Sequence, residues 1–478
     1  MEKYYDHFIG GKCVAPREKS DYQAMEKRPG SPVQVHVASG TDRDVAAAIS
    51  ACRAATPAWT VMDPMTRGRI LVDIARALRS RLDQFAEIEA AETGKPRWQA
   101  AQEMEGAAQY FEYFGGLTNT PKGDLIDMGG EYHTYTVREP YGVVGVITPW
   151  NAPLNQAARA IAPALATANT VLCKPSEFTS GTTVEFAKLA NSCGLPDGVF
   201  NVILGDGHGA GMSIVNNPHV RKIAFTGSVR AALEIGRIAA ERIIPLTLEL
   251  GGKSANIVFE DAELATAIPG AIMGFAANAG QVCTAGTRLL LQRSIRDVFI
   301  EGLKEAISQI KVGPEPDAKV GAIITHAQYE RILEYFDIAE REGATLVCGG
   351  RGAIQKDWGD GWYLPLTVYT DVTPNMRIAR EEIFGPVLAV MVFDEEDEAI
   401  RLANDSEYGL TAGLWTRNLS RALRAASALE SGTVNVNQYP AGNVLMPMGG
   451  QKRSGYGREK GVEALNHYTQ LKCISIKL

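Results

Sequence analysis

Apolar positions follow a helical spacing in the first part of the chain and change to short uninterrupted runs after residue 141. Residues 41–115 carry apolar side chains three and four positions apart, as amphipathic helices do. We expect one helix to begin in a capping box at Thr41–Asp44. A longer helical run is expected to extend from Asp63 to Gly94, because glycine commonly ends a helix.

From Tyr141 onward, apolar runs alternate with helical runs. Before residue 250 the predicted strands are YGVVGVITP, TVLCKPS, VFNVILG and KIAFTG, and after it they are SANIVF, TRLLLQ, PVLAVMVF and GTVNVN. Strands that are apolar throughout and alternate with helices indicate parallel sheets covered on both faces. Such sheets bind ligands at the carboxyl ends of their strands. The predicted fold class is therefore α/β, with two such regions.

Two more strands are predicted outside these regions, EYHTYTV at 131–137 and LKCISIKL at the C-terminus. Neither has an evident partner in the sequence, and a strand edge needs one. Pairing within the chain and pairing that helps to build an oligomer both remain open.

The composition excludes several classes of protein. The 478 residues are more than one hydrophobic core usually carries, so two or three domains are expected. Acidic and basic residues are intermixed at a net charge of −7, which favours neither nucleic acid nor an anionic membrane as a partner. The N-terminal MEKYYDHFIGGK lacks the apolar core of a signal peptide, and no apolar run is long enough to span a bilayer. The seven cysteines are scattered and HExxH is absent, so we expect free thiols, no metal site and a cytoplasmic location.

Three residues carry candidate chemistry. Cys283, in NAGQVCTAGTR, has small neighbours that leave its sulfur open, whereas a structural cysteine usually lies in an apolar run. Glu249, in TLELGGKSA, follows a strand and precedes two glycines that permit close approach of a ligand. Asn151, in VITPWNAP, lies in a proline-flanked loop where a rigid amide is able to stabilise an oxyanion. Taken singly, each also fits a purely structural role.

Together the motifs resemble one family. TPWN, KPSE, FTGS, ELGGK, GQVC, EEIFGPV and GGQKRSGYGRE occur in the order found in the aldehyde dehydrogenase superfamily, over about residues 10–478. The resemblance implies two Rossmann-like doubly wound parallel-sheet domains plus a small β oligomerisation element. It places an NAD-binding domain at 1–122 and 141–249, a catalytic domain at 250–453, and oligomerisation strands at 123–140 and 463–478.

The resemblance also implies a mechanism. A thiolate of Cys283 would attack the aldehyde to form a thiohemiacetal, and the side chain of Asn151 with the backbone N–H of Cys283 would hold the oxyanion. After hydride transfer to the nicotinamide, Glu249 would activate the water that hydrolyses the thioester to the carboxylic acid. No metal is required.

The expected cofactor is NAD. Lys174 suits ribose or phosphate oxygens, and Glu177 resembles the family's acceptor for the adenosine ribose hydroxyls. A carboxylate there would repel a 2′-phosphate, which makes NADP the less favoured cofactor. The alternative is that Glu177 only caps a helix. Further cofactor contacts are expected at Ile147, Thr148, Pro149, Trp150, Ser176, Gly207, Gly211, Phe225, Thr226, Gly227, Ser228, Leu250, Glu382 and Phe384.

The substrate is less well determined. Ala152 and Met448 stand where many family members carry larger aromatic residues, which predicts a wide pocket for a bulky apolar or aromatic aldehyde. Arg159 resembles a position that binds the carboxylate of semialdehydes in some members, so a carboxylated semialdehyde is an alternative. Val282 and Thr284 complete the expected substrate contacts.

Two alternative functions remain open. A CoA-acylating dehydrogenase has no need of a hydrolytic base such as Glu249, and a non-catalytic protein of the same fold would tolerate loss of the three candidate residues. The family forms homodimers or homotetramers, and the sequence does not choose between them.

Overall fold

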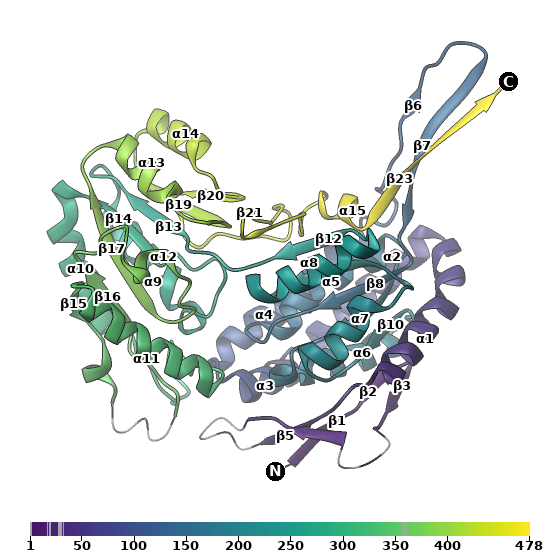
Figure 1. The fold of residues 1–478 in the computed structure, drawn as a ribbon, viewed down its shortest axis with the longest axis horizontal. Helices are drawn as coiled ribbons and strands as arrows, with labels where there is room; N and C mark the ends of the chain where they lie inside the picture. The colour runs from purple at the N-terminus through teal and green to yellow at the C-terminus, as the bar shows by residue number, and fades with distance from the viewer. Residues whose placement is uncertain are drawn as a thin grey trace.

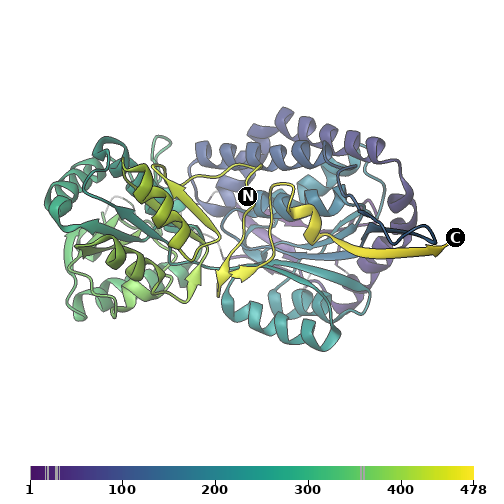
Figure 2. The same ribbon diagram turned by 90° about the horizontal axis from the view of Figure 1, so that it is seen from above.

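The structure is a computed structural model that describes residues 2–16, 18, 21–26, 31, 33–355, 358 and 361–478. These residues form two α/β lobes that lie side by side, and a β arm projects from the first lobe with the C-terminus at its tip (Figure 1, Figure 2). Each lobe is built on its own sheet. The α/β class predicted from the apolar runs is confirmed.

The first lobe contains an eight-stranded sheet in the order β22-β12-β11-β8-β9-β10-β2-β3. Its five central strands are parallel, namely β12 (Leu246–Glu249), β11 (Val220–Thr226), β8 (Val143–Ile147), β9 (Thr170–Lys174) and β10 (Phe200–Val202). Three antiparallel strands form its edges, namely β22 (Gly455–Tyr456), β2 (His7–Ile9) and β3 (Lys12–Val14). Because β22 returns from the far end of the chain, the C-terminal segment closes one edge of this sheet.

Helices cover the first lobe. They are α1 (Asp42–Val61), α2 (Pro64–Ser80), α3 (Leu82–Thr93), α4 (Arg97–Gly115), α5 (Pro153–Ala166), α6 (Gly181–Ser192), α7 (Met212–Asn216) and α8 (Val229–Arg242). The capping box at Thr41 is present, and Gly94 ends α3 in the left-handed conformation, as predicted. The helical run from Asp63 is two helices rather than one, because the backbone leaves the helical conformation at Arg81.

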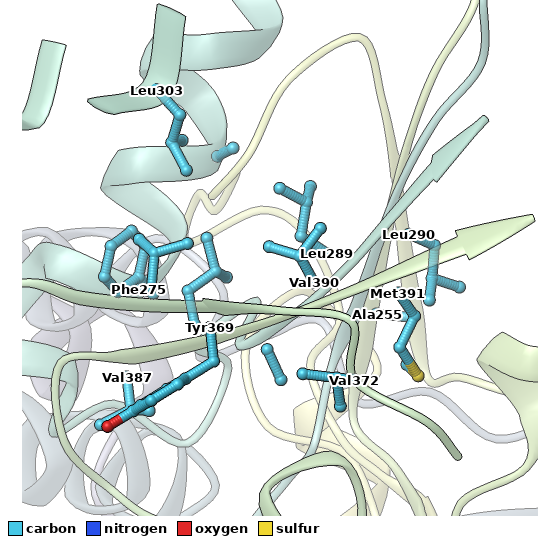
Figure 3. Close-up of a cluster of buried hydrophobic side chains, with 14 of the residues drawn as sticks. Ala255, Phe275, Leu289, Leu290, Leu303, Tyr369, Val372, Val387, Val390 and Met391 are labelled. Atoms are coloured by element: carbon cyan, nitrogen blue, oxygen red, sulfur yellow. The ribbon is translucent and has the colours of Figure 1, made fainter. Parts of the chain in front are cut away.

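The second lobe contains a seven-stranded sheet in the order β15-β16-β17-β14-β13-β19-β20. The parallel strands are β16 (Thr367–Thr370), β17 (Val387–Phe393), β14 (Arg288–Gln292), β13 (Ala255–Val258), β19 (Thr411–Trp415) and β20 (Thr433–Val436), and β15 (Thr345–Cys348) is antiparallel. Its helices are α9 (Leu264–Ala276), α10 (Arg296–Ser308), α11 (His326–Arg341), α12 (Arg377–Arg380), α13 (Glu396–Asn404) and α14 (Leu419–Ala428). Figure 3 shows its core, where Leu289 and Val390 of the sheet lie near Phe275 of α9.

The arm is a three-stranded antiparallel sheet of β6 (Leu125–Ile126), β7 (Tyr132–Pro140) and β23 (Thr469–Lys477). β23 pairs with β7 along its whole length, from Thr469 opposite Pro140 to Lys477 opposite Tyr132. Pairing within the chain, one of the two alternatives left open for these strands, is therefore present, since each strand satisfies one edge of the other. Among the described residues, the outer edge of β23 carries no further strand.

Smaller elements complete the fold. They are an N-terminal sheet of β1 (Glu2–Tyr5), β5 (Gln34–Ala38) and β4 (Tyr22–Ala24), a pair of β18 (Tyr408–Gly409) with β21 (Gln451–Lys452), and α15 (Ala464–His467). In the described part of the chain no helix combines the length and hydrophobicity needed to cross a membrane. The domain boundaries given above remain a prediction.

Candidate active site

Cys283 follows a sharp turn at the end of α9. Asn278 and Ala279 adopt φ values of 48° and 54°, and Gly280 follows with φ of +73°. A Cβ atom on Gly280 would lie 2.1 Å from the backbone oxygen of Gly385, so this position requires glycine. The turn carries Cys283 out of the helix to the boundary between the two lobes.

Two cavities meet at Cys283. The first is lined by Pro149, Trp150, Asn151, Gln156, Thr226, Gly227, Ser228, Glu249, Leu250, Gly251, Cys283, Gln328, Arg331, Glu382 and Phe384. The second includes Trp98, Glu103, Asn151, Ala152, Arg159, Met273, Val282, Cys283, Thr284, Met446, Met448 and Lys460. The partly exposed Cys283 is thus accessible from both sides, whereas Cys173 is fully buried in β9. A carbonyl group on one side and a hydride acceptor on the other are both able to reach it.

The backbone and side chain of Asn151 are held by three hydrogen bonds. Its Nδ2 donates to the backbone oxygen of Gln281 at 2.9 Å. Its own backbone oxygen accepts from Lys95 Nζ at 2.9 Å and from Asn278 Nδ2 at 3.0 Å. Asn151 is therefore attached to the turn that carries Cys283, and the amide is oriented before any substrate binds.

Lys95 lies in a buried cluster that the sequence did not reveal. Its Nζ contacts Glu89 Oε1 at 3.2 Å and forms a very short ion pair with Glu103. Burial raises the pKa of Glu89 well above its usual range. Lys95 directly follows Gly94, which ends a helix, and nothing in the adjacent sequence indicates that Lys95 holds the Asn151 loop.

Glu249 ends β12 and is only 2% exposed. Among the described residues neither carboxylate oxygen has a hydrogen-bond partner. Burial raises the pKa of Glu249 to about 8, although the guanidinium of Arg159 opposes the shift. Burial likewise raises the pKa of the Cys283 thiol to about 11, again against the effect of Arg159. Near neutral pH both groups are mainly protonated.

Arg159, on α5, forms a buried ion pair with Glu459. The two side chains are 3% and 1% exposed. Arg159 also donates to Thr226 Oγ1 at 3.2 Å and contacts Met448 Sδ at 3.4 Å. The charge of Arg159 is therefore balanced within the chain. Glu459 belongs to the GGQKRSGYGRE motif, but nothing in that motif indicates its partner.

The first cavity has features that fit NAD. It reaches the N-terminus of α8, where Ser228 caps the helix by accepting from the Ala231 N–H at 3.3 Å. The free N–H groups of a helix's first turn and its dipole favour a phosphate there. At the other end Glu382 accepts from the Gly252 N–H at 3.0 Å, and the rings of Phe384 and Trp150 meet edge to face at 5.3 Å. A dinucleotide in this cavity would extend from a phosphate-binding helix end to the thiol.

Several predicted cofactor residues are not among the residues that line this cavity. Lys174 Nζ donates to the backbone oxygens of Pro175 and Gly205, both at 2.8 Å, and lies 3.6 Å from Glu177 Oε2. This pairing leaves Glu177 partly exposed, as a contact to ribose hydroxyls requires. The others are Ile147 and Thr148 at the end of β8, Ser176 after β9, Phe225 in β11, and Gly207 and Gly211 in the turn Gly207–Gly211. In the described ranges no cluster of three metal-ligating side chains occurs.

Comparisons with known proteins give one consistent family. The sequence profile of the aldehyde dehydrogenase family matches residues 17–474. A betaine aldehyde dehydrogenase of Mesorhizobium japonicum is 40% identical over 474 residues, covering 98% of this chain and 97% of that protein. An NAD-dependent aldehyde dehydrogenase structure from Sinorhizobium meliloti has a TM-score of 0.96 at 38% identity and covers 100% of this chain and 95% of its own. An indole-3-acetaldehyde dehydrogenase structure in complex with NAD+ also has a TM-score of 0.96 at 38% identity, covering 99% and 97%. The chain belongs to the aldehyde dehydrogenase family and oxidises aldehydes with NAD.

Proposed function

We propose that the two cavities meeting at Cys283 are the cofactor side and the aldehyde side of one active site. The observation that carries the proposal is that Cys283 lines both of them. Cys283 acts as the nucleophile, Asn151 as the oxyanion donor and Glu249 as the base. The product is the carboxylic acid.

The first half of the reaction takes place at the sulfur. The partly exposed Cys283 thiol gives up its proton to solvent water, the thiolate attacks the carbonyl carbon, and the oxyanion of the thiohemiacetal forms beside Asn151. One Nδ2 hydrogen of Asn151 is bound to Gln281, and the second hydrogen remains for the oxyanion. Loss of one such donor typically lowers the rate about 100- to 1000-fold. When bound, NAD supplies the hydride acceptor.

The chain's own residues hold that cofactor. Gly227 and Ser228 offer the N-terminus of α8 to the pyrophosphate. Glu177, beside Lys174, accepts from the adenosine ribose, and Glu382 accepts from the nicotinamide ribose. Glu249 then deprotonates a water molecule, which hydrolyses the Cys283 thioester and releases the acid.

The nucleophile is tested by Cys283→Ser, with Cys13→Ser as a matched control because Cys13 is an exposed thiol on β3. We expect Cys283→Ser to form no NADH while it still binds NAD in isothermal titration. Cys13→Ser should retain full activity. Substantial turnover by Cys283→Ser would remove the cysteine from this role.

A bulky aldehyde fits the second cavity. Three flexible methionines, Met273, Met446 and Met448, lie on its walls, and methionine adapts to irregular ligands. Arg159 is less suited to bind a substrate carboxylate than the sequence indicated, because Glu459 already neutralises it. The buried Glu249 supports hydrolysis by water over transfer to CoA.

Betaine aldehyde is a second candidate, because it is in the name of a relative. Quaternary ammonium groups are bound in aromatic cages, and Trp98 is the only aromatic side chain among the described residues that line this cavity. The neutral isostere 3,3-dimethylbutanal separates the two candidates. We expect it to have the higher kcat/KM, and a clear preference for betaine aldehyde would reverse the assignment.

We also propose that the arm joins subunits into a homodimer or homotetramer. The outer edge of β23 carries no partner among the described residues, and Leu471 and Ile476 of this strand are exposed. Exposed edges of this kind pair with other strands.

A further inference from the structure

Three cations belong to the walls of the aldehyde-side cavity or lie directly behind them. Arg159 is paired with Glu459, and Lys95 is paired with Glu103. The third cation is Lys460, which lines the cavity itself. Among the described residues, no carboxylate forms an ion pair with Lys460, and its contact is a cation–π approach of Nζ to the Tyr110 ring at 5.8 Å.

The backbone holds Lys460 at this wall. Glu459 and Met448 exchange two backbone hydrogen bonds of 2.6 and 2.7 Å, and the Gly461 N–H donates to the Val444 oxygen at 2.7 Å. Both neighbours of Lys460 are thus attached to the loop that forms one side of the cavity. The lysine side chain extends between this loop and Tyr110 of α4.

Carboxylates of the described residues pair with two of these three cations and not with the third. The Arg159–Glu459 pair is neutral. Lys95 contacts the carboxylates of both Glu89 and Glu103. Glu249 is mainly protonated at neutral pH. Among the described residues Lys460 has no such partner, and it is near enough to lower the pKa of both Cys283 and Glu249.

We propose that Lys460 is a specificity-determining residue that binds a carboxylate or another anionic group on the tail of the aldehyde and disfavours cationic aldehydes. This inference rests on the proposed function of Cys283. The preferred substrate is then a bulky aldehyde with an anionic tail, and the recognising cation is Lys460 instead of Arg159. The methionines contact the apolar part of such a substrate, and Lys460 balances its charge.

The test compares 4-carboxybenzaldehyde with 4-nitrobenzaldehyde, whose nitro group is a neutral isostere of the carboxylate. The measured quantity is the ratio of their kcat/KM values, so intrinsic reactivity cancels between variants. We expect Lys460→Met to lower this ratio about 10- to 100-fold, mainly through KM of the carboxylated substrate, as loss of a charge-assisted hydrogen bond does. Lys460→Arg should keep most of the ratio, and Lys304→Met, an exposed change on α10, should leave it unchanged.

A ratio that stays the same in Lys460→Met while both aldehydes are oxidised would overturn the role of Lys460 and leave the proposed function intact. Wild-type protein provides a second measurement that needs no variant. Its ratio should fall as salt is raised, because screening weakens the attraction. A salt-independent ratio, or faster oxidation of betaine aldehyde than of either benzaldehyde, would also overturn the proposal. Absence of NADH formation with every aldehyde would instead contradict the proposed function.

Discussion

Glu249→Gln removes the proposed base while keeping the size of the side chain. In the wild-type protein the carboxyl group is buried and has a pKa of about 8. At pH 7, about one unit below that value, roughly a tenth of the Glu249 side chains are ionised, and at pH 9 about nine tenths are. If the ionised form activates water, hydrolysis of the thioester should become about tenfold faster between pH 7 and pH 9.

Two phases of NADH formation separate the steps in a rapid-mixing experiment. The first turnover reports formation of the Cys283 thioester, and the steady state reports its hydrolysis. We expect the steady-state rate of the wild type to rise with pH and to level off above pH 9. Glu249→Gln should lower it about 100- to 10,000-fold, the usual contribution of a general base. The acylated enzyme should then accumulate and be visible as added mass.

Glu241→Gln is a suitable control, because Glu241 is an exposed carboxylate near the end of α8. It should leave both phases unchanged. A steady-state rate in Glu249→Gln equal to that of the wild type would refute the assignment of the base. So would a wild-type profile that is flat between pH 7 and pH 9, because the buried carboxyl group would then not titrate in the rate-limiting step.

Three further predictions concern other residues. Lys95→Met removes a donor from the Asn151 carbonyl and leaves Glu103 without its ion-pair partner. We expect kcat to fall at least about tenfold and the free energy of unfolding to fall by about 3–5 kcal/mol. Steady-state kinetics and thermal unfolding measure these two effects, and an unchanged kcat would contradict the positioning role. Glu177→Gln removes the carboxylate that would repel the 2′-phosphate of NADP. The ratio of kcat/KM for NADP to kcat/KM for NAD should therefore rise about tenfold. An unchanged ratio would mean that Glu177 only caps a helix. Truncation after Tyr468 removes β23, so sedimentation velocity should show a smaller assembly, and an unaltered assembly would exclude the arm as an interface.

Local patterns in the sequence were sufficient for most elements of the fold. The uninterrupted apolar run of β8 and the capping box before α1 each depend on a few adjacent residues, so both were predicted from the sequence alone. The sequence likewise showed the small residues around Cys283 and predicted the loop position of Asn151. The helical run from Asp63 to Gly94 is present, but its division at Arg81 was not predicted, because that position has neither glycine nor proline to mark it.

The sequence did not predict which distant segments of the chain contact each other. The partner of Arg159 is Glu459, the carbonyl of Asn151 is held by Lys95, and β7 pairs with β23. Periodicity and turn residues are properties of a short window of the chain, whereas the charge that each cavity presents depends on which remote side chains the fold brings together. The sequence therefore indicated the candidate thiol, and the folded chain showed that Arg159 pairs with Glu459, whereas no carboxylate of the described residues pairs with Lys460.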